Sequence, residues 1–115
     1  MNNKQLKLLK DYVLKNGGAT LKNNGAFMDL AAGFMVSLAD TEKKISLSSL
    51  KLKDLNNYLK LAKNKNAFVG LWLDNNILYL DLSVNIINKN EALKVAKNNS
   101  QLAIYDIANQ ATIYL

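Results

Sequence analysis

The sequence contains no His, no Cys, no Arg and no Pro. Without His and Cys the chain cannot build a Ser-His-Asp triad, a Cys-His nucleophile, or a metal site that uses imidazole or thiolate ligands. Without Arg it has no arginine finger for phosphoryl transfer. The nine Asp and Glu are dispersed along the chain, which disfavours an oxygen-only Mg²⁺ or Ca²⁺ site. We therefore expect a non-enzymatic protein with no catalytic residues, metal or cofactor.

Long apolar runs are also absent. The most apolar segment, residues 26–39, is interrupted by Asp29 and Ser37, so it is no candidate for a membrane-spanning helix. The first ten residues mix Lys into their apolar positions, which is not the pattern of an export signal. Together with the lack of cysteine, these features predict a cytoplasmic protein with no membrane partner.

Lysine supplies all fifteen basic charges, and the chain also carries seventeen Asn. This bias is typical of an AT-rich genome. The charge is nevertheless uneven, because residues 1–65 carry a net +7 and residues 66–115 a net −1. The basic character therefore belongs to the N-terminal part of the chain.

Hydrophobic periodicity predicts one α+β domain spanning residues 1–115, with an antiparallel sheet of about five to six strands and two to three helices packed on it. Asn2 or Asn3 is expected to cap the first helix, Ser48 or Ser49 the second, and Asn90 the third. We expect a hairpin from residues 33–39 to 44–47, turning at Asp40, Thr41 and Glu42. The expected helices are 4–16, 49–63 and 91–98, and the other expected strands are 19–22, 67–73, 77–85, 102–107 and 111–115.

The strands 67–73 and 77–85 form the clearest hairpin, with Asn75 and Asn76 as its two-residue turn. In that register one face is aliphatic and must be buried. The other face has two interpretations. Trp72 and Tyr79 are either a cross-strand pair that stabilises an exposed sheet surface or lies under a helix, or the centre of a recognition patch. The candidate protein-binding patch consists of Phe68, Trp72, Tyr79, Asp81 and Ser83.

The lysines of the two long helices have two interpretations as well. They are either a solvated surface in a Lys-rich protein or a contact surface for nucleic acid phosphates. The chain has no helix-turn-helix, zinc-finger or ribonucleoprotein motif, so any such binding would tolerate many sequences. The candidate contacts are Lys4, Lys7, Lys10, Lys15, Lys53 and Lys60.

From residue 33 onward the chain resembles a diffuse group of short accessory proteins of bacteriophages and other mobile elements. The resemblance rests on the order of four pieces: Gly-Phe-Met-Val-Ser-Leu (33–38), Gly-Leu-Trp-Leu-Asp (70–74), Tyr-Leu-Asp-Leu-Ser (79–83) and Gln-Leu-Ala-Ile-Tyr-Asp (101–106), with Ala92-Leu93 between the last two. It implies an accessory protein in the cytoplasm of a bacterial host cell. Such a protein would inhibit a host defence complex of the nuclease or CRISPR type by binding it. The alternatives are a nucleic-acid-binding module and a structural homo-oligomer.

Overall fold

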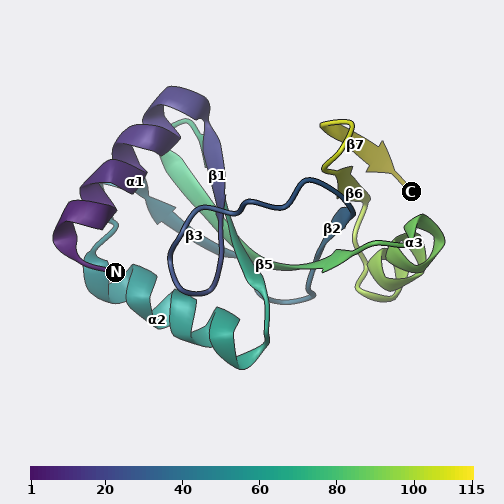
Figure 1. The fold of residues 1–115 in the computed structure, drawn as a ribbon. Coiled ribbons are helices and arrows are strands. Elements are labelled where there is room, and N and C mark those ends of the chain that lie inside the picture. The colour runs from purple at the N-terminus through teal and green to yellow at the C-terminus, as the bar shows by residue number, and fades with distance from the viewer. The chain divides into compact units, whose positions relative to one another are not determined.

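The computed structural model describes all residues, 1–115, and confirms an α+β fold. Its three helices accompany one antiparallel sheet of seven strands, slightly more strands than expected. The helices are α1 (Asn3–Asn16), α2 (Leu52–Asn64) and α3 (Lys89–Asn98), with a single 3₁₀ turn η1 (Leu47–Ser49) before α2 (Figure 1). The strands are β1 (Gly18–Leu21), β2 (Phe34–Ser37), β3 (Lys43–Ser46), β4 (Phe68–Asp74), β5 (Ile77–Ile86), β6 (Ala103–Asp106) and β7 (Ala111–Tyr114).

The chain forms two compact units, and each unit is built from two stretches of sequence. The first unit comprises Met1–Met28 and Glu42–Leu82, and the second comprises Asp29–Thr41 and Ser83–Leu115. The sheet order is β1-β4-β5-β2-β6-β7, with β3 also paired to β5. That residues 1–115 act as one domain stays a prediction.

In the first unit, α1 and α2 pack against the aliphatic face of the strands (Figure 1). Aliphatic residues alternate with other residues along β4 and β5, and every second side chain of a strand points to the same face. This alternation therefore gathers the aliphatic side chains on the face that the helices cover. The resulting core is almost entirely aliphatic and consists of Leu6, Leu9, Val13, Leu21, Leu47, Leu50, Leu55, Tyr58, Leu59, Ala62, Ala67, Val69, Leu71, Leu78, Leu80 and Leu82. Leu73, which follows Leu71 by two residues and therefore points to the same face, is half-buried.

The first helix begins and ends as its sequence predicts. The Asn2 side chain accepts a hydrogen bond from the backbone N–H of Gln5, while the Gln5 side chain accepts one from the Asn2 N–H, forming a capping box. Gly17 ends the helix with a φ of 83°, a left-handed conformation that glycine adopts at little cost.

The predicted serine cap of the second helix is wrong. Ser48 and Ser49 belong to the 3₁₀ turn, and the Ser48 hydroxyl hydrogen-bonds the Ser46 hydroxyl at 3.0 Å. The helix starts after Lys51, whose backbone N–H donates to the Asp54 carboxylate at 3.2 Å. Asp54 thus stabilises the positive end of α2 from inside its first turn.

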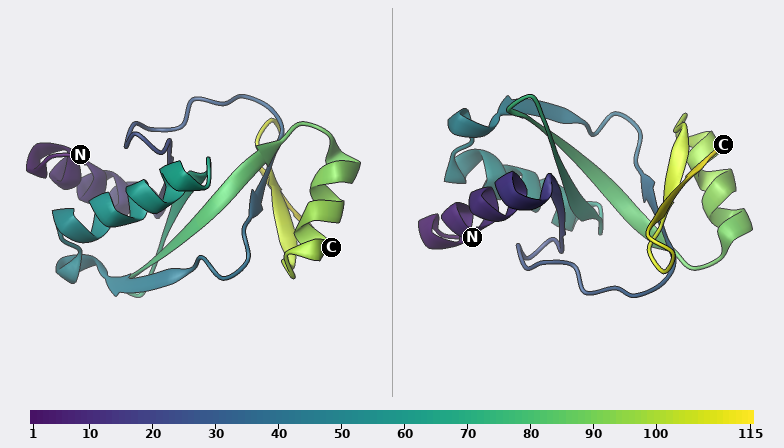
Figure 2. Two further views of the ribbon diagram at one scale, coloured as in Figure 1. Left: turned by 90° about the horizontal axis from the view of Figure 1, so that it is seen from below. Right: turned by 90° about the horizontal axis from the view of Figure 1, so that it is seen from above.

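In the second unit, α3 covers one face of the strands β2, β6 and β7 and the end of β5 (Figure 2). Its small residues Ala92 and Ala96 are fully buried, which brings the helix close to Val36 and Ile104 of the sheet. The cap of α3 is Asn88 and not the predicted Asn90, because the Asn88 side chain accepts from the Glu91 N–H at 2.9 Å.

The predicted hairpin between β2 and β3 is also wrong. Both strands pair antiparallel with β5, β2 along residues 83–86 and β3 along residues 77–80, so the chain between them does not reverse direction. Residues 38–42 instead form a loop in which Asp40 has a φ of 58° and the Thr41 hydroxyl donates to the Leu38 carbonyl. Of the three predicted turn residues only Asp40 lies in a turn, and the segment continues along β5 without forming a hairpin.

No helix combines the length and apolar character that crossing a bilayer requires.

Candidate functional site

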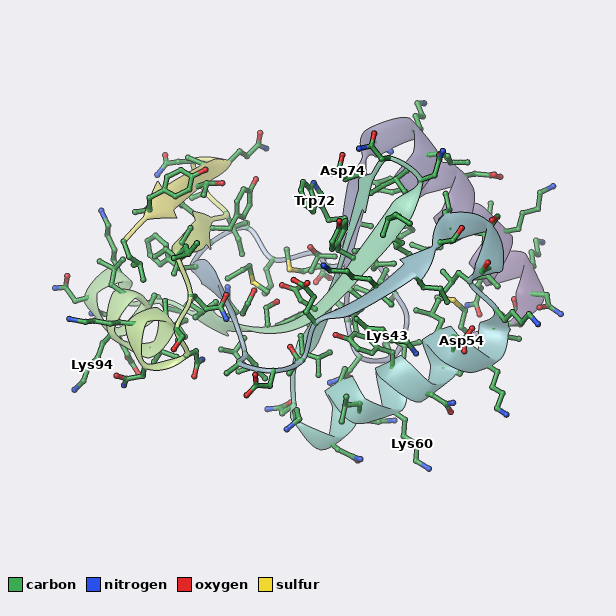
Figure 3. The ribbon with its side chains drawn as sticks, turned by 180° about the vertical axis from the view of Figure 1, so that it is seen from behind. Lys43, Asp54, Lys60, Trp72, Asp74 and Lys94 are labelled. Atoms are coloured by element: carbon green, nitrogen blue, oxygen red, sulfur yellow. The ribbon has the colours of Figure 1, made fainter.

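Trp72 lies on the face of the first unit's sheet that α1 and α2 do not cover (Figure 3). We call this surface the open face. Trp72 is 60% exposed, and it is the only tryptophan of the chain. The ring centroid lies 5.4 Å from that of Tyr79, with the planes tilted by 45°. This geometry falls within the range of favourable aromatic pairs, so the two side chains stabilise each other while the indole stays accessible.

The turn between β4 and β5 sets the position of this pair. Asn75 and Asn76 have φ values of 49° and 64°, as a type I′ turn requires. Leu47 donates a backbone hydrogen bond to the Asn76 carbonyl, which ties the turn to the segment that follows β3. The predicted hairpin is therefore confirmed, and with it the placement of Trp72 beside Tyr79.

Strand β3 adds a charge to the open face. Lys44 pairs with Tyr79 in the β3–β5 register, and its ammonium lies 5.3 Å from the Tyr79 ring centroid. A cation at this distance is attracted by the negative face of the ring. Lys44 was not among the predicted site residues, because the sequence does not indicate that β3 lies beside β5.

A shallow hollow of about 190 Å³ adjoins the aromatic pair. Two carboxylates, those of Asp81 and Glu42, contribute to its lining. Gly70 lies beneath Asp81, and a Cβ atom added to Gly70 would collide with the Asp81 carboxylate. The absence of a side chain at Gly70 thus gives this carboxylate its place on the sheet surface. The full lining is Ala19, Thr20, Glu42, Gly70, Leu71, Trp72, Tyr79 and Asp81.

Two members of the predicted patch do not belong to this site. Ser83 is only 6% exposed, because at this point β5 is an interior strand paired with β2, so its inclusion in a binding surface is wrong. Phe68 is half-buried and is not part of the lining of the hollow. The candidate site therefore consists of Trp72, Tyr79 and Asp81, joined by Glu42 and Lys44.

The candidate nucleic-acid contacts divide into two groups. Lys7 and Lys10 line a second, larger hollow of about 640 Å³ beside α1. The other four, Lys4, Lys15, Lys53 and Lys60, are exposed and do not line it; Lys60 extends from α2 into solvent (Figure 3). The structure thus brings only two of the six lysines into one concave site.

The acidic side chains form no metal-binding cluster. No three of them are grouped in a way that could hold a metal ion. Asp106 is a buried acidic residue of the second unit, and its carboxylate accepts hydrogen bonds from Asn109. A hydrogen bond from the Asn109 side chain to Asp106, at 2.7 Å, lowers the pKa of this carboxyl, and backbone N–H donors of the same turn act in the same direction. Its role is to hold the β6–β7 turn.

Comparisons of the chain with protein-family models, with curated proteins and with solved structures give no match.

Proposed function

We propose that the protein acts by stoichiometric binding of a protein partner through the open face, with Trp72 as the anchor. The observation that carries this proposal is an indole 60% exposed yet held in place by Tyr79. Tryptophan and tyrosine dominate the energetics of protein interfaces, because each removes a large area from water at little cost in side-chain entropy. A single such residue commonly contributes about 2 kcal/mol or more to binding.

The hollow beside Trp72 favours a partner that presents a basic side chain. Asp81 and Glu42 supply two carboxylates there, and the Trp72 ring supplies an electron-rich face. A lysine or arginine can form charge-assisted hydrogen bonds with carboxylates while its cationic end lies over an indole. Because the first unit as a whole carries a net +7, this acidic hollow is a local exception that distinguishes the site from its surroundings.

We further propose that this is a non-enzymatic accessory protein of a phage or mobile element, acting in the cytoplasm of a bacterial host. Its partner would be a host nucleic-acid-targeting defence complex. The support is the resemblance carried by residues 33–38, 70–74, 79–83 and 101–106, together with the lack of His, Cys and Arg. Inhibition by binding requires no catalytic group, which suits this composition.

Partner capture from host lysate tests the proposal. The wild-type chain and Trp72→Ala are immobilised in parallel, and Leu102→Ala serves as the matched control, since Leu102 is 83% exposed but lies in the second unit. We expect a protein that is retained by the wild type and by Leu102→Ala but lost with Trp72→Ala. Equal retention by all three proteins would remove the open face from consideration.

Nucleic-acid binding is the second candidate, favoured by the concentration of charge in the first unit. Twelve of the fifteen lysines belong to this unit, which contains only five acidic residues. Binding through phosphate contacts would weaken steeply with salt. Absence of a mobility shift with single- or double-stranded DNA and RNA at low salt would reject this candidate.

A further inference from the structure

The larger hollow, of about 640 Å³, is a separate site of the first unit. It lies between α1, the end of β3 with the following η1 turn, and the tip of the β4–β5 turn. It shares no lining residue with the hollow beside Trp72. Pockets that bind small molecules typically measure about 300 to 1,000 Å³, so a ligand of nucleotide size fits the space.

The charged groups of this hollow favour an anion. Lys7 and Lys10 lie three residues apart on α1, so their ammonium groups are neighbours on one face of the helix. Like charges at this spacing repel each other. An anion placed between the two ammonium groups is attracted by both, and these attractions offset the repulsion. Asp11 is the only carboxylate in the lining, which leaves a local excess of positive charge.

Neutral hydrogen-bonding groups also line this hollow. The hydroxyls of Ser46 and Ser48 are 3.0 Å apart, and in such a pair one hydroxyl donates to the other. The accepting hydroxyl keeps its own hydrogen, which is free to donate to a ligand oxygen. The side-chain amide of Asn76 offers further donors, because the contact of Asn76 with Leu47 uses only its backbone carbonyl.

The hollow also has an apolar part. Leu14 is 59% exposed on α1, and Leu47 is buried at the start of the 3₁₀ turn. The exposed leucine presents apolar surface on which the uncharged portion of a ligand would be removed from water. A suitable ligand therefore combines an anionic group with a flat or apolar body.

From this combination we propose that the hollow binds a phosphomonoester of nucleotide size, with its phosphate between Lys7 and Lys10 and its ring system against Leu14. The hydroxyls of Ser46 and Ser48 donate to the remaining phosphate oxygens or to a sugar. This ligand site does not depend on partner binding at the open face, and either proposal can fail without the other.

Titration of the isotopically labelled full-length chain, followed by amide NMR signals, tests the site with AMP, adenosine, inorganic phosphate and a short oligonucleotide. We expect AMP to shift signals of residues that line the hollow in a saturable manner, with adenosine and phosphate each binding about tenfold or more weakly. Equal affinity for AMP and adenosine would overturn the proposal, since the lysines would then contribute nothing. Binding of the oligonucleotide without AMP would also overturn it and would assign the lysines to nucleic acid.

Two variants locate the binding. The double substitution Lys7→Gln and Lys10→Gln is expected to weaken AMP binding by about tenfold or more, whereas Lys53→Gln with Lys60→Gln removes the same charge from α2 and leaves the affinity unchanged. Substitution of Ser46 and Ser48 with Ala is expected to weaken binding less strongly. Circular dichroism confirms that each variant is folded. Unchanged AMP affinity in the Lys7 and Lys10 variant would refute the site.

Discussion

The Trp72–Tyr79 pair allows a quantitative test of the structure before any partner is known. The perturbation is a double-mutant cycle of Trp72→Ala, Tyr79→Ala and both together. Because Trp72 is 60% exposed, it buries about 100 Å² in the fold, which sets an upper limit of about 2.5 kcal/mol on the loss from its single substitution. At a centroid distance of 5.4 Å, the coupling between the two rings should be about 0.5 to 1.5 kcal/mol.

Urea unfolding followed by far-UV circular dichroism is the appropriate assay, since removal of the only tryptophan abolishes its fluorescence signal. Leu80→Ala, at a side chain only 1% exposed in the core, is the reference and should cost about 2 to 5 kcal/mol. A coupling indistinguishable from zero would show that the rings do not contact each other in solution. A loss for Trp72→Ala clearly above the limit of about 2.5 kcal/mol would show that the indole is a core residue.

Three other predictions concern the close approach of β1 to β4, the Asp106 carboxyl and the free edge of β7. Gly18→Ala should destabilise the fold by about 1 to 3 kcal/mol in thermal or urea unfolding. The added Cβ would lie 2.7 Å from the Leu71 carbonyl oxygen, so β1 would have to move. An unchanged stability would contradict the close approach of β1 to β4. The lowered pKa of Asp106 means that its ionised form stabilises the fold above about pH 4 and that this contribution disappears as the pH falls through the folded-state pKa. Asp106→Asn should therefore lose less stability than the wild type between pH 5 and pH 2, and identical pH profiles would refute the assignment. Strand β7 pairs only with β6 and carries no charge, so its free edge can pair with another copy of the chain. We expect concentration-dependent self-association in light scattering, and Thr112→Lys should suppress it. A wild type that stays monomeric at high concentration would contradict this expectation.

Local signals in the sequence explain what could be predicted. The capping box of Asn2 with Gln5 and the left-handed Gly17 define α1 within the residues of the helix itself. The turn Asn75-Asn76 likewise fixes the register of its own two strands, and with it the placement of Trp72 beside Tyr79. In each case the determining interactions join residues close in sequence.

Interactions between distant segments explain the errors. Whether β3 pairs with β2 or with β5 depends on which strand edge is available, and nothing within residues 33–47 specifies it. For the same reason Glu42 and Lys44 were missed as neighbours of Asp81 and Tyr79. Ser83 has the alternation of an exposed residue, and only the pairing of β2 with this part of β5 reveals that it is buried.

Binding of the captured partner to purified Trp72→Ala decides whether Trp72 anchors the partner on the open face. Isothermal titration calorimetry against the wild type, Trp72→Ala and Leu102→Ala separates a specific anchor from a general loss of exposed apolar surface, provided that circular dichroism shows all three to be folded. We predict one-to-one binding by the wild type and Leu102→Ala and an affinity reduced about thirtyfold or more in Trp72→Ala, which corresponds to about 2 kcal/mol. An unchanged affinity in folded Trp72→Ala would contradict the account.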